Sequence, residues 1–268
     1  MLIRVGCVAV AAALVLSLPA PAEESHPPHW GYSADDGPAR WAELSPEWEI
    51  CAGGRRQSPI DLHRTSAAEK EPLRFSYRPA DFQIVRHEHV LDFLDNGHTI
   101  QVNWDDGSSV RVGEHEYGLL QFHFHAPSEH TVDGRRFPME LHLVHRDEDG
   151  NLAVVGVLVE EGARNSAYDV IWSNLPESSG EKRHLEGVHL EVDDLVPQAG
   201  GTWRYEGSMT TPPCTEGVRW LVVMDPVSLS KEQIAAYTSH YSGNNRPVQS
   251  SNNRILLEVS GPEESTSP

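Results

Sequence analysis

The stretch QFHFHAPSEHTVDGRRFPMELHLVH, residues 121–145, alternates polar and apolar side chains on both sides of a loop. Side chains two residues apart in a strand point to the same face. His123 and His125 therefore share a face of the first strand, and His142 lies in the second strand. A short hairpin from Ser128 to Pro138 would lay the second strand beside the first. The pattern predicts an antiparallel pair of strands that brings three histidines together.

Other segments of alternating or β-branched residues predict further strands, and turn signals such as Asn96-Gly97 separate them. The predicted strands are 82–85, 90–94, 99–104, 118–125, 140–145, 152–160, 188–192, 203–205 and 219–224. Helical pattern is scarce. It covers Ala163 to Leu175 and a segment to Ser239 that opens with the capping box Ser230-Lys231-Glu232-Gln233. The chain is predicted to be mainly β (α+β).

The N-terminus has the features of a secretory signal peptide. Arg4 precedes an apolar run from Val8 to Leu18, and small residues end at Ala22. The run is shorter than the roughly 20 residues of a membrane span. We therefore expect a signal peptide over 1–22, one domain over 23–260 and a disordered tail over 261–268. The mature protein is expected in the periplasm or secreted.

Charge and cysteine content narrow the partners and the compartment. The formal net charge of −19 disfavours nucleic acid and anionic membranes as partners. After cleavage only Cys51 and Cys214 remain, and an even pair in an exported protein favours one disulfide. Two buried free thiols are the alternative. A bridge closing a loop of about 160 residues contributes about 4 to 5 kcal/mol in the chain-entropy model.

The histidine cluster favours a catalytic zinc site. A lone H-x-H pair is more often packing or surface, but Glu140 and His142 on one face of the next strand supply a third imidazole. Three neutral histidines leave zinc an open position and lower the pKa of bound water to about 7. A structural zinc site would use four ligands, usually including cysteine.

The chain also resembles the α-class carbonic anhydrases, specifically the exported bacterial type, over nearly the whole mature sequence. The matching motifs occur in family order: HWGY at 29–32, RQSPIDL at 56–62, NGH at 96–98, QFHFH at 121–125, SEHTVDG at 128–134, ELHLVH at 140–145, LAVVGV at 152–157, GSMTTPPCTEGVRW at 207–220 and NNRPVQ at 244–249. The resemblance implies a single domain around a twisted, largely antiparallel sheet of about ten strands with a few short peripheral helices.

The resemblance implies the following metal site and reaction. Zinc is held by His123, His125 and His142, with Gln121, Glu140 and the backbone carbonyl of Asn244 as their hydrogen-bond partners. The reaction is reversible hydration of carbon dioxide to bicarbonate and a proton by zinc-bound hydroxide. Ester hydrolysis is a side activity.

The resemblance also assigns roles around the metal. Thr210 accepts a hydrogen bond from the hydroxide and donates to Glu129, and His98 is the proton shuttle. The carbon dioxide pocket is formed by Val144, Val154, Met209, Thr211, Val218 and Trp220, and the proton-path waters are ordered by Tyr32, Asn96 and Gln101. No role is assigned to His87, His89, His115, His130 or His145.

Further implications concern the disulfide, the backbone and the ligands. Cys51 and Cys214 match the disulfide pair of exported family members, and Ser58-Pro59 and Pro212-Pro213 match sites of cis peptides. Anions and sulfonamide-type compounds are expected inhibitors. The oligomeric state, including a homodimer, stays open.

Three rival interpretations remain. A cupin-type metalloenzyme would use Glu129 as a ligand of iron or manganese, although the thirteen residues from Glu129 to His142 are few for that fold. A non-catalytic zinc-binding module would lack hydration activity. A periplasmic zinc carrier would favour exchangeable ligands over a fixed network.

Overall fold

The computed structural model describes residues 28–65, 68–69, 74–76, 91–95, 97–104, 107–185, 190, 192–197 and 200–261. The expected signal peptide, the expected strand 82–85, Asn96 and the expected tail from residue 262 onward lie outside the described residues.

The strands are β1 (Asp61–Leu62), β2 (Ala68–Glu69), β3 (Arg74–Ser76), β4 (Leu91–Asp95), β5 (Ile100–Asn103), β6 (Ser109–Val112), β7 (His115–His125), β8 (Thr131–Val132), β9 (Arg135–Arg136), β10 (Met139–Arg146), β11 (Leu152–Glu161), β12 (Lys182–Leu185), β13 (Thr202–Ser208), β14 (Glu216–Leu229) and β15 (Leu257–Val259). The α-helices are α1 (Trp41–Leu44), α2 (Ile50–Gly53), α3 (Asp169–Trp172) and α4 (Lys231–Thr238). The 3-10 helices are η1 (Pro46–Trp48), η2 (Ser166–Tyr168) and η3 (Val192–Leu195).

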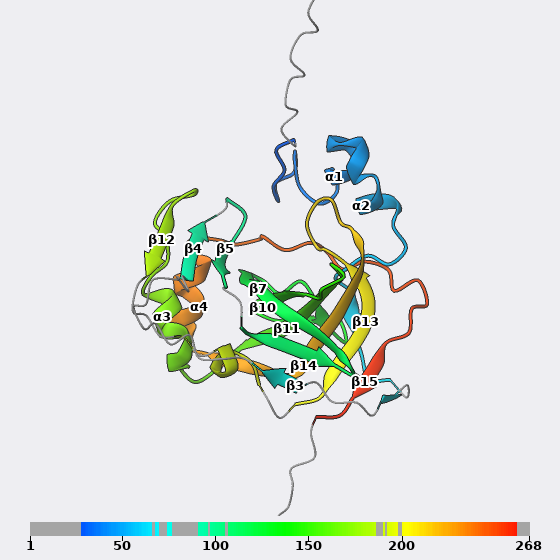
Figure 1. Cartoon of the computed structure of the whole chain (residues 1–268). Coiled ribbons are helices and arrows are strands. Elements are labelled where there is room, and N and C mark those ends of the chain that lie inside the picture. The colour runs from blue at the N-terminus through cyan, green and yellow to red at the C-terminus, as the bar shows by residue number, and fades with distance from the viewer. Residues whose placement is uncertain are drawn as a thin grey trace, which may run out of the picture.

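One large twisted sheet dominates the molecule, with the short helices at its periphery (Figure 1). Among the described residues it has twelve strands, and its main path runs β12-β4-β5-β7-β10-β11-β14-β13-β15-β2. Most neighbours are antiparallel, while the pairs β11–β14 and β15–β2 are parallel. The mainly β fold with a large, largely antiparallel sheet is confirmed.

Both faces of β11 are buried from Ala153 to Val159, which fits its nearly continuous apolar sequence. On β10, Met139, Leu141 and Leu143 belong to the main apolar core, while the intervening Glu140 and His142 face the opposite side. The same alternation along β11 and β14 fills the two faces with separate apolar clusters, while the buried apolar residues of β7 belong to the main core alone. The polar residues of the site therefore project from a sheet whose opposite face is covered by the main core.

The predicted helices differ in extent from those observed. Between 163 and 175 only η2 and α3 form. The side chain of Asn165 accepts from the N–H of Ala167 at the first turn, and the proline at 176 disfavours helical geometry at Leu175. The capping box at Ser230 and Gln233 is confirmed at the start of α4. Val192, expected at the end of a strand, begins η3 instead.

No helix in the described ranges is long and apolar enough to cross a membrane.

Candidate active site

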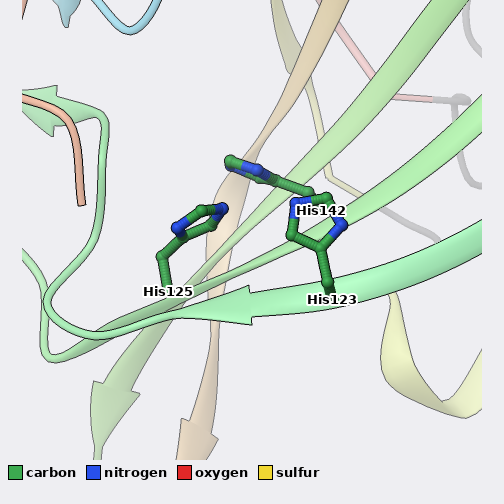
Figure 2. A group of neighbouring side chains, drawn as sticks. All are labelled: His123, His125 and His142. Atoms are coloured by element: carbon green, nitrogen blue, oxygen red, sulfur yellow. The ribbon is translucent and has the colours of Figure 1, made fainter. Parts of the chain in front are cut away.

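Three histidine rings converge above the sheet (Figure 2). The antiparallel register of β7 and β10 pairs His123 with His142 and His125 with Glu140. The ring centroids of His123 and His125 lie 5.1 Å apart, and the ring of His142 lies 5.3 Å and 4.7 Å from them. The predicted hairpin and the shared face are confirmed, because the alternation of both strands turns these rings to one side.

Each ring has one nitrogen engaged outside the cluster. The Nδ1 atom of His123 lies 2.8 Å from Gln121 Oε1, and the Nδ1 atom of His125 lies 2.6 Å from the backbone carbonyl of Asn244. His142 uses Nε2 instead, 2.9 Å from Glu140 Oε1. Since these acceptors carry no hydrogen, each engaged nitrogen is the donor. The remaining nitrogens are His123 Nε2, His125 Nε2 and His142 Nδ1.

The remaining nitrogens fit a metal ion. One nitrogen from each ring lies within 4.8 Å of the others. His125 Nε2 is buried and has no hydrogen-bond partner among the described residues. Burial, together with the charges that the neighbouring rings would carry, lowers the pKa of His123 well below its ordinary value. Burial likewise lowers the pKa of His125, and both shifts favour the neutral form that binds metal.

The carboxylate of Glu140 is the hub of a buried network. Oε1 accepts from His142 and, at 2.7 Å, from Nδ1 of His130, and Oε2 accepts the backbone N–H groups of Glu129 and His130 at 2.8 Å each. Burial alone would raise the pKa of Glu140, but the charges and hydrogen bonds of His130 and His142 hold it well below its usual value. A side chain at Gly156 would place Cβ 3.1 Å from Oε1. Glycine at position 156 thus leaves room for the carboxylate of Glu140.

The same carboxylate also outweighs the effect of burial on the pKa of His142. Burial lowers the pKa of this ring, but the charge of Glu140 and its hydrogen bond raise the pKa above the ordinary value. His130, Glu140 and His142 also lie close enough together to form a second cluster of metal-binding type. Because the facing atoms of that cluster already share hydrogen bonds, it is a support for the first cluster rather than a second metal site.

Glu129 lies behind the cluster. Its Oε1 accepts the backbone N–H of Arg246 at 2.7 Å, while its buried Oε2 has no hydrogen-bond partner among the described residues. Oε2 lies 3.6 Å from His125 Nε2 and 3.9 Å from His142 Nδ1. Thr210 is buried near the start of the loop that follows β13. The hydrogen bond expected between Thr210 and Glu129 stays a prediction.

A cavity of about 110 Å³ opens beside the three rings. Its walls include most of the residues predicted for catalysis, the pocket and the proton path, together with Gln121, the partner of His123. The residues are Tyr32, His98, Gln101, Gln121, Val144, Val154, Met209, Thr210, Thr211 and Trp220. Val218 does not line this cavity but packs in the apolar cluster behind it, with Val144, Val154 and Trp220. One side of the cavity is therefore apolar and the other polar.

His98 stands at the polar side of the cavity. Its ring stacks on Trp30 with centroids 3.6 Å apart and planes 7° apart. Tyr32 packs edge-on against Trp30. Burial and the charge of Glu129 raise the pKa of Tyr32 well above its ordinary value, so its hydroxyl keeps its hydrogen. Gln101 donates to Asn103.

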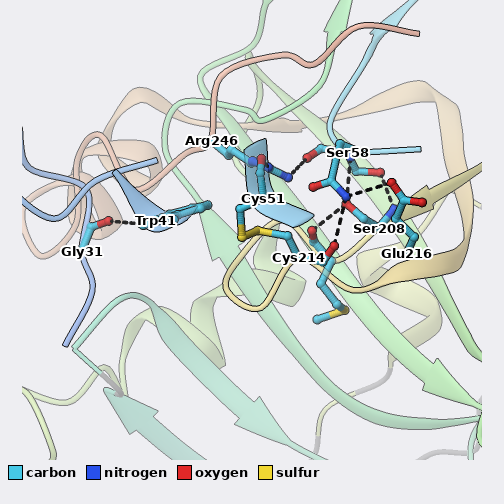
Figure 3. The surroundings of a disulfide bond; sticks show 10 residues. Gly31, Trp41, Cys51, Ser58, Ser208, Cys214, Glu216 and Arg246 are labelled. Carbon is cyan, nitrogen blue, oxygen red and sulfur yellow. Dashed lines mark hydrogen bonds between the residues drawn. A yellow bond between two sulfur atoms is a disulfide. The ribbon is translucent and has the colours of Figure 1, made fainter. Parts of the chain in front are cut away.

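A disulfide joins Cys51 to Cys214, as predicted (Figure 3). It ties the N-terminal helix α2 to the loop carrying Thr210, where Cys214 N–H donates to the carbonyl of Thr211 at 2.8 Å. The side chain of Gln57 donates to the carbonyl of Cys214. The peptides Ser58-Pro59 and Pro212-Pro213 are cis, as the resemblance implied, and so is Ala126-Pro127.

Four residues of the site escaped sequence reasoning. His130 links Glu140 to the hydroxyl of Tyr205 at 2.7 Å, and this hydroxyl donates to Ser58 Oγ at 2.9 Å. Buried Arg246 donates to the carbonyls of Ser58 and Cys51. Ser58 lies in RQSPIDL, His130 in SEHTVDG and Arg246 in NNRPVQ. These motifs marked the segments that carry the three residues, but the bonds to Tyr205, Ser58 and Cys51 join positions that lie far apart in the sequence.

A family model described as eukaryotic-type carbonic anhydrase matches residues 36–260. A carbonic anhydrase of Pectobacterium carotovorum is 38% identical over 246 residues, covering 91% of this chain and 97% of that protein.

Two solved structures share the fold over nearly their own whole length. The α-carbonic anhydrase of Thermovibrio ammonificans, in complex with the inhibitor sulfanilamide, has a TM-score of 0.78 at 40% identity, covering 86% of this chain and 99% of that chain. A hyperthermostable carbonic anhydrase from an active hydrothermal vent chimney has a TM-score of 0.78 at 42% identity, covering 87% and 100%.

Proposed function

Since this chain belongs to the eukaryotic-type, or alpha, carbonic anhydrase family, whose members are zinc lyases, we propose that it catalyses zinc-dependent, reversible hydration of carbon dioxide to bicarbonate and a proton. The observation that carries the proposal is the convergence of three ring nitrogens whose partner nitrogens are all held by hydrogen bonds.

Zinc would be held by His123 Nε2, His125 Nε2 and His142 Nδ1. When bound by three neutral imidazoles, zinc lowers the pKa of a water molecule to about 7 and so supplies a nucleophile near neutral pH. The acceptors Gln121, Glu140 and the carbonyl of Asn244 fix the tautomer and orientation of the rings.

We assign Thr210 and Glu129 the task of orienting the nucleophile. Ionised Glu129 offers only acceptors, and Oε2 is the one not used by Arg246. If the Thr210 hydroxyl donates its single hydrogen to Oε2, its oxygen can only accept a hydrogen from the nucleophile. That polarity aims a lone pair of the nucleophile at the carbon of the substrate.

The apolar wall of the cavity suits carbon dioxide, which is small and has no hydrogen to donate. Val144, Val154 and Trp220 are each at most 5% exposed and keep this wall dry. We assign Met209 and Val218 to the same pocket, Met209 as a flexible lining residue and Val218 as packing behind it. Thr211 and the backbone N–H of Thr210 would meet the oxygens of bicarbonate.

The proton released in each cycle would leave through His98. An imidazole with an ordinary pKa near 6.5 can accept a proton from a group near 7 and pass it to buffer. The position of His98 on the wall of the same cavity supports this role. We assign Tyr32, Asn96 and Gln101 to ordering the connecting waters.

Other properties follow from the same site. Sulfonamide-type compounds and small anions are proposed inhibitors, on the strength of the relative in complex with sulfanilamide, and ester hydrolysis is a proposed side activity. The disulfide favours an oxidising compartment, so we propose that residues 1–22 are a signal peptide and that the protein is periplasmic or secreted. The catalytic domain would span 23–260.

The family membership disfavours the cupin-type alternative. The two remaining rivals, a zinc-binding module without activity and a zinc carrier, are separated from the enzyme by stopped-flow hydration of carbon dioxide. The wild type is expected to exceed the buffer background, and His142→Ala, which removes one ligand, is expected to lose most of the activity and most of the zinc. A wild type at background would refute the proposed function.

A further inference from the structure

A single side chain connects the proposed shuttle with the metal-binding strand. Asn244 is 3% exposed and lies in the segment that follows α4. Its backbone carbonyl accepts from His125 Nδ1 at 2.6 Å, and its side-chain Nδ2 donates to the backbone carbonyl of His98 at 3.0 Å. One residue thus contacts a proposed zinc ligand and the backbone of the proposed shuttle.

The rest of the Asn244 side chain is held just as firmly. Oδ1 accepts the backbone N–H of Ala126 at 2.8 Å, and Nδ2 also lies 3.2 Å from the carbonyl of Phe124 and 3.1 Å from the hydroxyl of Tyr237. The Tyr237 hydroxyl donates to the same Phe124 carbonyl at 2.6 Å. The amide is therefore fixed against the end of β7.

The segment around Asn244 is anchored on both sides. The N–H of Gly243 donates to the carbonyl of Ala126 at 2.6 Å, and the N–H of Arg246 donates to Glu129. The ring of His98 stacks on Trp30. The backbone of His98 is thus bonded to Asn244, beside the proposed metal ligand His125, while its ring is stacked on Trp30.

We infer that Asn244 is a positioning residue for proton transfer, because its side-chain amide sets the place of His98 relative to His125. The inference rests on the proposed function, since it requires His98 to carry protons. A small displacement of a reacting group costs a large factor in rate. Loss of the amide should therefore slow proton transfer more than it slows the interconversion of carbon dioxide and bicarbonate.

The test measures both steps by exchange of ¹⁸O between carbon dioxide and water, on protein with one zinc per chain. Asn244→Ala and Asn244→Ser, which lack the amide donor, are expected to lower the rate constant of proton transfer by about tenfold, with a smaller loss in interconversion. Added imidazole is expected to restore the turnover of these two variants, because it can accept the proton in place of His98. In a His98→Ala background, either substitution should have little further effect on proton transfer.

Tyr237→Phe is the matched control, since it removes a hydroxyl from the same polar cluster but keeps the bond from Asn244 to His98. Its proton transfer should stay near that of the wild type. Equal losses in the presence and absence of His98, or an equal loss in Tyr237→Phe, would overturn the inference and leave the proposed function standing. A wild type without any interconversion would overturn both.

Discussion

Replacing Glu140 with glutamine keeps the shape of the side chain and changes the chemistry of one atom. In the wild type, both carboxylate oxygens accept two hydrogen bonds each, Oε2 from the backbone N–H groups of Glu129 and His130, and Oε1 from the rings of His130 and His142. A glutamine offers one accepting oxygen and one donating NH₂ group in the same places.

The geometry decides which way the amide turns. With NH₂ toward the two backbone N–H groups, donors would face donors, and backbone N–H groups cannot give up their hydrogens. The NH₂ group therefore faces the rings. His142 Nε2 must then accept a hydrogen bond, which moves the ring hydrogen to Nδ1, the atom that faces His123 and His125.

The expected effect is a large loss of zinc affinity. Losing one hydrogen-bond partner of a ligand typically weakens metal binding by about 10- to 100-fold. The unfavourable tautomer of His142 puts Glu140→Gln near the upper end of that range, about 100-fold or about 2.7 kcal/mol. Two charge-assisted hydrogen bonds, worth about 1.5–3 kcal/mol each, are also lost or reversed, so the metal-free protein should be less stable too.

Competition with a chromogenic chelator of known affinity measures the effect at neutral pH. Gln121→Ala is the matched control, because it removes a neutral acceptor from His123 without forcing a tautomer, and a loss of about tenfold is expected. If Glu140→Gln bound zinc as tightly as the wild type, the assignment of His142 Nδ1 as a ligand atom would be wrong.

Three further predictions concern stability. Burial lowers the pKa of His145 from 6.5 to about 3, so below about pH 6.5 the unfolded state binds a proton that the folded state does not, and folding stability falls as the pH falls. Urea unfolding should show that the wild type loses about 1.4 kcal/mol per pH unit more than His145→Gln between about pH 6 and pH 4, and parallel curves would contradict this. Replacing Cys51 and Cys214 together with serine should lower the free energy of unfolding by about 5 kcal/mol in denaturant titrations, and an unchanged midpoint would refute a structural bridge. A Cβ at Gly207 would overlap Ser58 Oγ, so Gly207→Ala should lower the melting temperature, whereas Gly53→Ala, with open space around it, should not.

The convergence of the three histidines, our proposed ligand triad, was predictable from the sequence because it depends on local geometry. Alternation along residues 121–125 and 139–146 fixes which side chains share a face, and the short loop between them allows one antiparallel pairing. The disulfide was likewise predictable, because only two cysteines follow the expected signal peptide.

The hydrogen bonds that hold the site together could not be predicted from the sequence in the same way. The bonds from Arg246 to Glu129 and from Asn244 to His98 join residues more than a hundred positions apart, and no periodicity marks them. The role of His130 depends on a loop conformation that places its ring between Glu140 and Tyr205. The helix predicted over 163–175 was too long. The apolar pattern continues up to Pro176, but the α-helix spans only residues 169–172.

A zinc titration of metal-free protein, with carbon dioxide hydration recorded at each addition, tests most directly whether the three imidazoles form a catalytic centre. Activity is expected to be absent at the start, to rise linearly and to level off at one zinc per chain. Activity in the fully demetallated protein, or one equivalent of bound zinc without any hydration, would contradict the account.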